Sequence, residues 1–260
     1  MELGLKGKRA LVTGAGRGLG CEIAQSLARE GAIVAAVSRT ESDLETLQAN
    51  LCGYGNGHLI HALDLAHDDG PATLVNVLKE REFFPVDIIV HNLGGTLEIS
   101  NPFCSIVDWR RVFRLNLEVA IELNLLLMPQ MQKQGWGRVV LIGSISGEEN
   151  HGPIPYCSVK AALSAYGRSL GRVVAPDGVV VTTVLPGAVF TDGGYWDIAS
   201  KERPEHVKNY LESRMAIGRF GKPSEIGNIV TFLCSEHASF CIGSVIPVDG
   251  GQGRSYFTHD

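Results

Sequence analysis

Tyr156 and Lys160 are the two residues whose types and spacing most clearly suggest chemistry in this sequence. Four positions apart on a helix, their side chains lie on one face. A free tyrosine has a pKa of about 10 and exchanges protons poorly at neutral pH. An ammonium group about 4 Å away, at an effective dielectric of about 20, is worth about 4 kcal/mol, so Lys160 is expected to lower the pKa of Tyr156. Such pairs are common on helix surfaces, so the meaning of this one depends on its surroundings.

A glycine-rich segment, T-G-A-G-R-G-L-G from Thr13 to Gly20, directly follows an apolar run typical of a buried strand. Glycines permit a tight turn and let the backbone approach a pyrophosphate, whose charge is met by amide N–H groups at the start of the next helix. Such a turn can also serve packing alone. Its position between the first strand and the first helix favours a dinucleotide site.

The residues after the second predicted strand bear on which dinucleotide would bind. Sites that select NAD usually offer a carboxylate there to the ribose hydroxyls, whereas this chain has Ser38 followed by Arg39. An arginine binds a 2′-phosphate, and Arg17 could supply a second cation. We therefore predict NADP(H) in preference to NAD(H). The alternatives are that both arginines are solvated, or that Glu41 or Asp43 accepts the ribose hydroxyls instead of stabilising a helix start.

Short apolar runs alternate with helical patterns from residue 8 to about residue 250. This alternation predicts an α/β, doubly wound Rossmann fold with a seven-stranded, mostly parallel sheet and helices on both faces. Strands are expected at 9–13, 33–38, 58–64, 86–92, 138–144, 179–185 and 244–248, and helices at 20–30, 42–51, 70–81, 108–134, 156–175 and 224–234. We predict a single domain over 1–260, with a substrate lid at about 191–220 that includes a helix at 204–215.

Composition limits the classes of function to consider. An apolar fraction of 45% and a charged fraction of 20% are ordinary for a globular protein, and a net charge of −5 offers no basic excess to nucleic acid or anionic lipid. No run of about 18 apolar residues and no apolar signal core occurs, so we expect a cytoplasmic protein that binds neither nucleic acid nor membrane. The six cysteines lack the spacing of a zinc site, which predicts free buried thiols and no metal.

In their order and spacing, the motifs of this chain resemble those of the short-chain dehydrogenase/reductase family, in its single-domain branch, over essentially the whole sequence. They are T-G-x-x-x-G-x-G at Thr13 to Gly20, Asp64-Leu65, His91-Asn92-Leu93-Gly94, Asn116, Gly143-Ser144, Tyr156 with Lys160, Pro186-Gly187 with Thr191, and Val248-Asp249-Gly250-Gly251. The resemblance implies hydride transfer between a nicotinamide and a carbonyl or secondary alcohol, as in the family's 3-oxoacyl thioester reductases.

The resemblance also implies roles for four catalytic residues, Asn116, Ser144, Tyr156 and Lys160. Ser144 would polarise the substrate carbonyl, and Tyr156 would donate or accept the proton. Lys160 would lower the pKa of Tyr156 and bond the nicotinamide ribose, while Asn116 would hold a water behind it. Ser146 competes with Ser144 for the catalytic assignment, and the spacing to Tyr156 favours Ser144.

The cofactor would be bound by residues from six segments. Asp64 would touch the adenine, Asn92 would lie along the adenosine ribose, and Thr191 would bond the carboxamide. The full set that the resemblance implies is Thr13, Gly14, Gly16, Arg17, Gly18, Leu19, Gly20, Ser38, Arg39, Asp64, Leu65, Asn92, Gly94, Tyr156, Lys160, Pro186, Gly187, Val189 and Thr191. The chain departs from the family at His91 and Leu93, where asparagine and alanine are usual; His91 is expected to replace a structural hydrogen bond, and Leu93 to narrow the space beside the cofactor.

The polar segment between Ser144 and Tyr156 is expected to line the substrate pocket. Predicted substrate contacts are Ser144, Glu148, His151, Tyr156 and, in the lid, Trp196. Three functions stay open: an NADP(H)-dependent reductase of 3-oxoacyl thioesters, a dehydrogenase or reductase of a sugar or polyol, and a non-catalytic nucleotide-binding regulator. Trp196 would either stack on a sugar ring or anchor the lid. The resemblance further implies a homotetramer, with a homodimer as the alternative, assembled through helices 108–134 and 156–175 and the strand at 244–248.

Overall fold

Within residues 1–149 and 152–254, seven strands form where apolar and often β-branched residues follow one another. Their bounds are β1 Arg9–Thr13, β2 Ile33–Ser38, β3 Leu59–Ala62, β4 Ile88–His91, β5 Gly137–Ile142, β6 Val179–Pro186 and β7 Val245–Val248. They differ from the predicted bounds by at most two residues at either end. β6, with the sequence V-V-V-T-T-V-L-P, is buried along its whole length, as expected of a strand that helices cover on both faces.

The strands pair in parallel into one sheet with the order β3-β2-β1-β4-β5-β6-β7. The structure is a computed structural model that describes residues 1–149 and 152–254. β1 pairs with β2 on one side and β4 on the other, so the chain crosses over β1 after β3. In sheets of this kind, ligands bind at the C-terminal ends of the strands beside such a crossover. The predicted doubly wound fold is confirmed.

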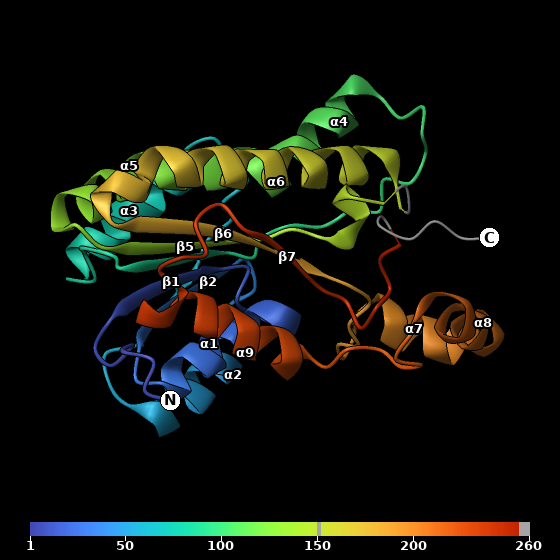
Figure 1. Ribbon diagram of the computed structural model, residues 1–260, viewed down its shortest axis with the longest axis horizontal. Helices are drawn as coiled ribbons and strands as arrows, with labels where there is room; N and C mark the ends of the chain where they lie inside the picture. Colours follow the sequence, from blue (N-terminus) through green and yellow to red (C-terminus); the bar gives the residue numbers. More distant parts are fainter. Residues whose placement is uncertain (150–151, 255–260) are drawn as a thin grey trace.

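Helices cover both faces of the sheet (Figure 1). Their bounds are α1 Gly18–Arg29, α2 Glu41–Leu51, α3 Gly70–Glu80, α4 Ile106–Phe113, α5 Val119–Gln134, α6 Ile154–Val174 and α9 Pro223–Leu233. α1, α2 and α9 lie on one face, where Leu27 and Val230 belong to one buried apolar cluster. α3, α5 and α6 lie on the other, where Leu123 and Leu163 belong to a second.

The helix predicted at 108–134 is wrong in one respect, because it is not continuous. α4 ends at Phe113, the residues Arg114–Glu118 form a π-helical turn, and α5 begins at Val119. Turns of this kind are rare and occur frequently at functional sites, because the wider turn redirects one residue of the helix. The turn contains Asn116, which is 2% exposed.

The predicted lid segment contains two helices, α7 (Tyr195–Glu202) and α8 (Pro204–Arg214). They lie apart from the helical layers, beyond the C-terminal ends of β6 and β7 (Figure 1). An aromatic cluster holds the segment together, since the ring of Trp196 lies 4.3 Å from that of Tyr210 and 4.6 Å from that of Phe220 between centroids. Of the two roles considered for Trp196, these contacts favour an anchor within the lid.

Two further features bear on the expectations from composition. Over residues 1–149 and 152–254, no helix combines the length and the apolar character that crossing a bilayer requires. Cys21, Cys52, Cys104, Cys234 and Cys241 are free thiols, but only Cys234 among them is buried. The prediction of buried thiols is therefore wrong for Cys52, which lies in an exposed turn after α2, and Cys21, Cys104 and Cys241 are half-buried.

Candidate active site

Three cavities follow one another along the C-terminal edge of the sheet. The central cavity, of about 430 Å³, lies between the glycine turn and α6. The arginine cavity, of about 260 Å³, shares Gly14 and Arg17 with it and is also lined by Arg39. The lid cavity, of about 780 Å³, shares Ser144 and Tyr156 with the central cavity and is lined by the lid on its other side. The proposed proton-transfer residue therefore stands at the junction of two cavities.

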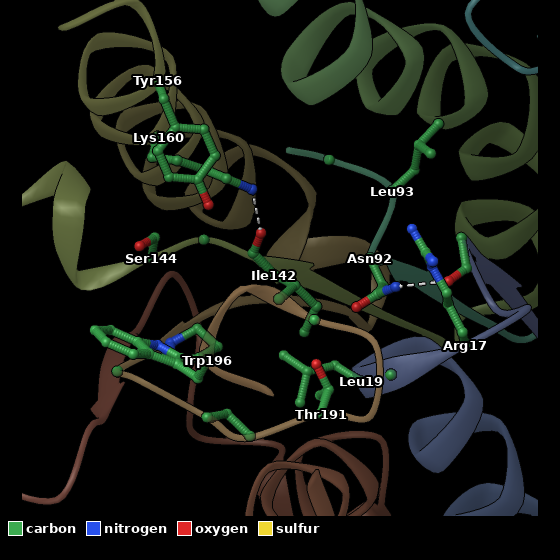
Figure 2. Close-up of a pocket in the computed structure, with 18 of the residues that line it drawn as sticks. Arg17, Leu19, Asn92, Leu93, Ile142, Ser144, Tyr156, Lys160, Thr191 and Trp196 are labelled. Carbon is green, nitrogen blue, oxygen red and sulfur yellow. Dashed lines mark hydrogen bonds between the residues drawn. The ribbon is translucent and has the colours of Figure 1, made fainter. Parts of the chain in front are cut away.

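Steric contacts explain the glycines of the turn after β1. Gly14 and Gly18 adopt φ angles of +65° and +58°, which favour glycine. A Cβ atom at Gly20 would lie 2.2 Å from the carbonyl oxygen of Gly14. The side-chain amide of Asn92 donates hydrogen bonds to the carbonyl oxygens of Thr13 (3.2 Å) and Gly14 (3.0 Å), as Figure 2 shows in part. Asn92 thus holds the turn that presents the N-terminus of α1 to the central cavity.

Most of the predicted cofactor residues line the central or the arginine cavity. Those that do are Gly14, Arg17, Gly18, Leu19, Ser38, Arg39, Leu65, Asn92, Gly94, Tyr156, Lys160, Pro186, Gly187, Val189 and Thr191. Thr13, Gly16, Gly20 and Asp64 are not among the lining residues in the described part of the chain. Thr13 has a structural role instead, because its hydroxyl accepts a hydrogen bond from the N–H of Leu93 at 3.1 Å.

The arginine cavity holds the residues predicted to select the dinucleotide. Arg17, Ser38 and Arg39 line it together with Asp43. Arg39 lies 3.9 Å from Asp64, and its side chain is 66% exposed. An exposed pair at this distance contributes at most about 1 kcal/mol, so the guanidinium can exchange that carboxylate for an anionic ligand. Asp43 is the carboxylate that a ribose would meet in the alternative assignment.

Tyr156 and Ser144 face one another across the junction of the cavities (Figure 2). Burial raises the pKa of Tyr156, and a hydrogen bond with Ser144 acts in the opposite direction. The net lowering expected for this pKa is not seen, because the desolvation of the phenolate outweighs the hydrogen bond with Ser144. Tyr156 is therefore protonated at neutral pH and equipped to donate a proton. Ser146 lines only the lid cavity, so the geometry favours Ser144 as its catalytic partner.

Lys160 lies beside Tyr156 on α6 and is 3% exposed. Its Nζ atom donates a hydrogen bond of 2.8 Å to the carbonyl oxygen of Ile142 and lies 5.5 Å from the centre of the Tyr156 ring (Figure 2). Burial lowers the pKa of Lys160 to about 8, so the ammonium form predominates at neutral pH. The lysine thus places a cation and N–H donors against the central cavity.

Asn116 contributes to the site through the loop after β4. Its Oδ1 accepts a hydrogen bond from the N–H of Gly95 at 3.0 Å, and its Nδ2 donates to the carbonyl oxygen of Gly95 at 2.9 Å. A Cβ atom at Gly94 would lie 2.6 Å from Asn116 Oδ1 and 3.1 Å from Lys160 Nζ. Asn116 therefore lies close to the lysine and fixes the backbone between them.

His91, which departs from the family pattern, belongs to a buried polar chain. Asn124 on α5 donates a hydrogen bond of 3.0 Å to the hydroxyl of Tyr166 on α6, and its Oδ1 lies 2.8 Å from His91 Nε2. Because the amide nitrogen serves Tyr166, the oxygen faces the histidine, and His91 Nε2 must carry the proton. Burial lowers the pKa of His91 to about 4. The side chain joins β4 to both helices, which supports the structural role expected of it.

Mild acid is expected to destabilise the protein through His91. Its pKa is about 4 in the folded chain, whereas that of an unfolded histidine is about 6.5. The unfolded state therefore binds the extra proton between these values, and stability falls as the pH drops below about 6.5. From pH 7 to pH 5 the loss from this group is about 2 kcal/mol. Urea unfolding of the wild type and of His91→Asn at both pH values measures it: the variant should lose less stability, and an equal loss would exclude His91 as the source.

Residues that sequence reasoning missed line much of the lid cavity. They are Gly95, Thr96, Glu98, Ser100, Ile145, Ala188, His206, Tyr210 and Gln252, besides Ser144, Tyr156 and Trp196. Glu98 and the preceding Leu97 have positive φ angles of 60° and 52°, a strained conformation for non-glycine residues that is often found at functional sites. No sequence pattern predicts the strained backbone at Leu97 and Glu98. The lining residues of α8 lie far along the chain from the catalytic motifs.

The polar segment after Ser144 lies only partly where it is predicted, because Gly152 and Pro153 line the lid cavity and Glu148 does not. Glu148 is exposed and is not among the described residues that line the lid cavity, and its contact with substrate stays a prediction. Its neighbour Glu149 turns toward the lid, where it pairs with Arg214 at 3.5 Å and accepts a hydrogen bond from the N–H of Arg254. The predicted contact of His151 lies outside the described residues. Those residues include no group of three or more His, Cys, Asp or Glu side chains suited to a metal ion.

Comparison with known proteins places this geometry in a family. Residues 14–252 match the family described as enoyl-(acyl carrier protein) reductase. The chain is 33% identical to the 3-oxoacyl-(acyl-carrier-protein) reductase of Aquifex aeolicus over 264 aligned residues, which cover 97% of this chain and 100% of that protein.

Two solved structures are also similar. L-sorbose reductase from Gluconobacter frateurii, in complex with NADPH and L-sorbose, has a TM-score of 0.91 at 28% identity, covering 97% of this chain and 98% of that one. A 3-oxoacyl (acyl-carrier-protein) reductase from Agrobacterium tumefaciens C58 with NADP bound has a TM-score of 0.88 at 31% identity, covering 96% of each chain. Together with the fold and the residues around Tyr156, these matches show that the chain belongs to the short-chain dehydrogenase/reductase family.

Proposed function

We propose that this protein is an NADP(H)-dependent oxidoreductase that interconverts a ketone and a secondary alcohol. The observation that carries the proposal is the position of Ser144 and Tyr156, which line both the central cavity and the lid cavity. A nicotinamide in the first cavity and a carbonyl compound in the second would meet at these two side chains. A non-catalytic regulator would have no use for this arrangement, which argues against that alternative.

The residues of the chain would act on the carbonyl oxygen. The nicotinamide supplies the hydride, which would form the new C–H bond at the carbonyl carbon. Ser144 and Tyr156 would donate hydrogen bonds to the oxygen, whose negative charge grows as the reaction proceeds. Tyr156, kept protonated by burial, would pass its proton to that oxygen and complete the alcohol. Lys160 would stabilise the tyrosinate left behind, and the reverse steps would oxidise an alcohol.

The protein fits NADP(H) at several points. The cramped glycine turn lets a pyrophosphate approach the N-terminus of α1, and Lys160 faces the central cavity. Arg17 and Arg39 line the arginine cavity, where they would bind a 2′-phosphate. The solved relatives with NADPH or NADP bound support this assignment.

The substrate candidates differ in what the lid cavity must accommodate. A hydroxylated ketone, such as a sugar, is favoured by the hydroxyl, amide and carboxylate side chains that line the cavity, among them Ser146, Gln252 and Glu98. The second candidate, a 3-oxoacyl thioester, is favoured by the name of the Aquifex relative. A thioester would place its β-carbonyl at Tyr156 and extend its carrier out of the cavity.

A cofactor consumption screen tests the proposal. Purified protein would be mixed with NADPH or NADH and with ketohexoses, simple ketones and an acetoacetyl thioester, and the loss of absorbance of the reduced cofactor would be followed. We expect oxidation of NADPH with at least one ketone, faster than that of NADH. Binding of NADPH without turnover of any substrate, in either direction, would contradict the proposal.

Assembly into a homotetramer is expected from exposed apolar side chains. Ile106 on α4 is 64% exposed, and Leu125 on α5 and Val173 on α6 are each 71% exposed. These helices carry the surfaces predicted for assembly, and exposed apolar surface of this kind marks interaction sites. Light scattering should give the mass of four chains of 28.0 kDa, about 112 kDa. Leu125→Asp should lower the mass and Ile198→Asp, on α7, should not; a monomeric wild type would contradict the prediction.

A further inference from the structure

Gln252 is a buried polar residue that lines the lid cavity. It follows β7 and is 2% exposed, and its backbone N–H donates a hydrogen bond of 3.2 Å to the carbonyl oxygen of Asp249. A polar side chain buried to this degree is costly unless its donors and acceptors find partners. The hydrogen-bond partners of the Gln252 side chain therefore indicate its role.

The surroundings determine which end of the Gln252 amide is the oxygen. The backbone N–H of Ala188 can only donate, and it lies 2.7 Å from Oε1 of Gln252. The amide nitrogen, Nε2, must then face the other way, where it donates a hydrogen bond to the hydroxyl of Tyr210 on α8. Gln252 thus connects the loop after β6, which lines the central cavity, to the lid.

One hydrogen of the amide is left over. A primary amide carries two N–H donors, and the bond to Tyr210 uses one of them. Within residues 1–149 and 152–254, the second has no hydrogen-bond partner. The group that carries it is fixed in direction at both ends and borders the lid cavity. A ligand oxygen is the partner that this donor lacks.

The charges around the lid cavity narrow the class of ligand. Among the described residues that line it, none is lysine or arginine, and Glu98 contributes a carboxylate. His206 is the one side chain in this described lining that can carry a positive charge, and Glu98 would repel a phosphate or a carboxylate of a substrate. Thr96, Ser100 and Ser146 add hydroxyl groups that can accept or donate hydrogen bonds. Most of the lining is apolar, with Ile145, Pro153 and Ala188 among its residues, so it suits an uncharged ligand that has both hydroxyl groups and apolar surface.

We propose that Gln252 is a specificity-determining residue that donates its second amide hydrogen to a hydroxyl oxygen of an uncharged polyhydroxy ketone. The inference rests on the proposed function, because it assumes that the carbonyl of this ketone lies at Tyr156. A ketone without the hydroxyl would leave the amide donor buried and unpaired, which is the usual way in which a site rejects a less polar analogue. A neutral ketose has these properties, whereas the 3-oxoacyl part of a thioester, which would enter the cavity, carries no hydroxyl group for the amide donor.

The test measures discrimination between matched substrates. NADPH-dependent reduction of a ketohexose would be compared with reduction of each of its monodeoxy derivatives and of 2-hexanone, as ratios of kcat/KM. We expect the wild type to prefer the ketohexose over at least one monodeoxy derivative by about tenfold, the worth of one hydrogen bond to a buried donor. In Gln252→Glu, which keeps an acceptor for Ala188 but loses the donor, and in Gln252→Met, that ratio should fall to about one.

Two controls separate this role from support of the fold. Tyr210→Phe removes the lid partner but leaves the amide donor, so the ratio should persist even where turnover declines. Gln132 also bridges two elements, through its hydrogen bond of 2.6 Å to Asp177, but it is not among the described residues that line the cavities. The ratio of kcat/KM values measured with Gln132→Met should therefore equal that of the wild type. NADPH titration by fluorescence verifies that each variant is folded.

The outcomes distinguish the inference from the proposed function. A ratio that stays at its wild-type value in both Gln252 variants would overturn the inference, and so would a wild type that reduces 2-hexanone or the acetoacetyl thioester but not the ketohexose. In both cases the protein would still be an NADPH-dependent ketone reductase. If the wild type reduces none of the compounds, the proposed function itself fails and the inference with it.

Discussion

Tyr156→Phe is expected to lower kcat for ketone reduction by a factor of about 10²–10⁴, the range that a positioned general acid contributes. The phenylalanine ring keeps the shape of the tyrosine but has no proton to give to the carbonyl oxygen. Because Lys160 and the glycine turn are unchanged, the Kd of NADPH should stay within about twofold of the wild-type value. Steady-state kinetics with the best ketone of the screen, together with fluorescence titration of NADPH, measure both quantities.

Tyr166→Phe is the matched control for this prediction. Tyr166 lies on the same helix as Tyr156, and its replacement by phenylalanine removes the same hydroxyl group. The hydroxyl of Tyr166 bonds Asn124, and Tyr166 is not among the described residues that line the cavities. The control should retain its kcat, although it should be less stable. A Tyr156→Phe enzyme with the turnover of the wild type would show that another group supplies the proton.

Arg39→Ala is expected to lower kcat/KM for NADPH by about 10- to 100-fold and to leave kcat/KM for NADH nearly unchanged. A hydrogen bond between charged partners contributes about 1.5–3 kcal/mol, which corresponds to this range. Arg39 lines the arginine cavity, and its exposed pair with Asp64 can yield to a phosphate. The kinetics would be measured with each cofactor at a saturating concentration of ketone.

Arg29→Ala is the control for Arg39→Ala, because it also removes an arginine side chain. Arg29 lies at the far end of α1, where it pairs with Glu22, outside the cavity lining. It should leave both cofactor constants unchanged. If Arg39→Ala affects NADPH and NADH equally, the arginine has a general role and does not read the 2′-phosphate. An Asp43→Ala variant that loses NADH turnover selectively would instead support ribose binding by that carboxylate.

The central strands of the sheet could be predicted from the sequence because they are apolar runs that are buried almost along their whole length. The bounds of β1 and β2 agree with the prediction residue for residue. The glycine turn could also be predicted from the sequence. Gly14 and Gly18 have positive φ angles, and at Gly20 any other side chain would clash with the backbone. Local rules sufficed for these features.

The remainder of the site depends on contacts between distant segments, which no local pattern reports. The sequence pattern around Asn116 is continuously helical, yet the structure has a π turn there. The side chain of Asn116 makes hydrogen bonds with Gly95, which is distant in the sequence. Gln252 lines the lid cavity only because the segment after β7 returns to α8, where Gln252 bonds Tyr210. The direction of the pKa shift at Tyr156 was likewise misjudged, since the spacing to Lys160 is visible in the sequence and the degree of burial is not.

The central claim is that a hydride passes directly from nicotinamide to the carbon of a ketone bound beside Tyr156. The most direct measurement uses NADPH carrying deuterium at the transferable position of C4, followed by mass spectrometry of the alcohol. The account predicts one deuterium on the carbinol carbon per NADPH oxidised, and loss of this labelled product in proportion to kcat in Tyr156→Phe. Oxidation of NADPH without label in the alcohol, or no alcohol from any ketone, would contradict it.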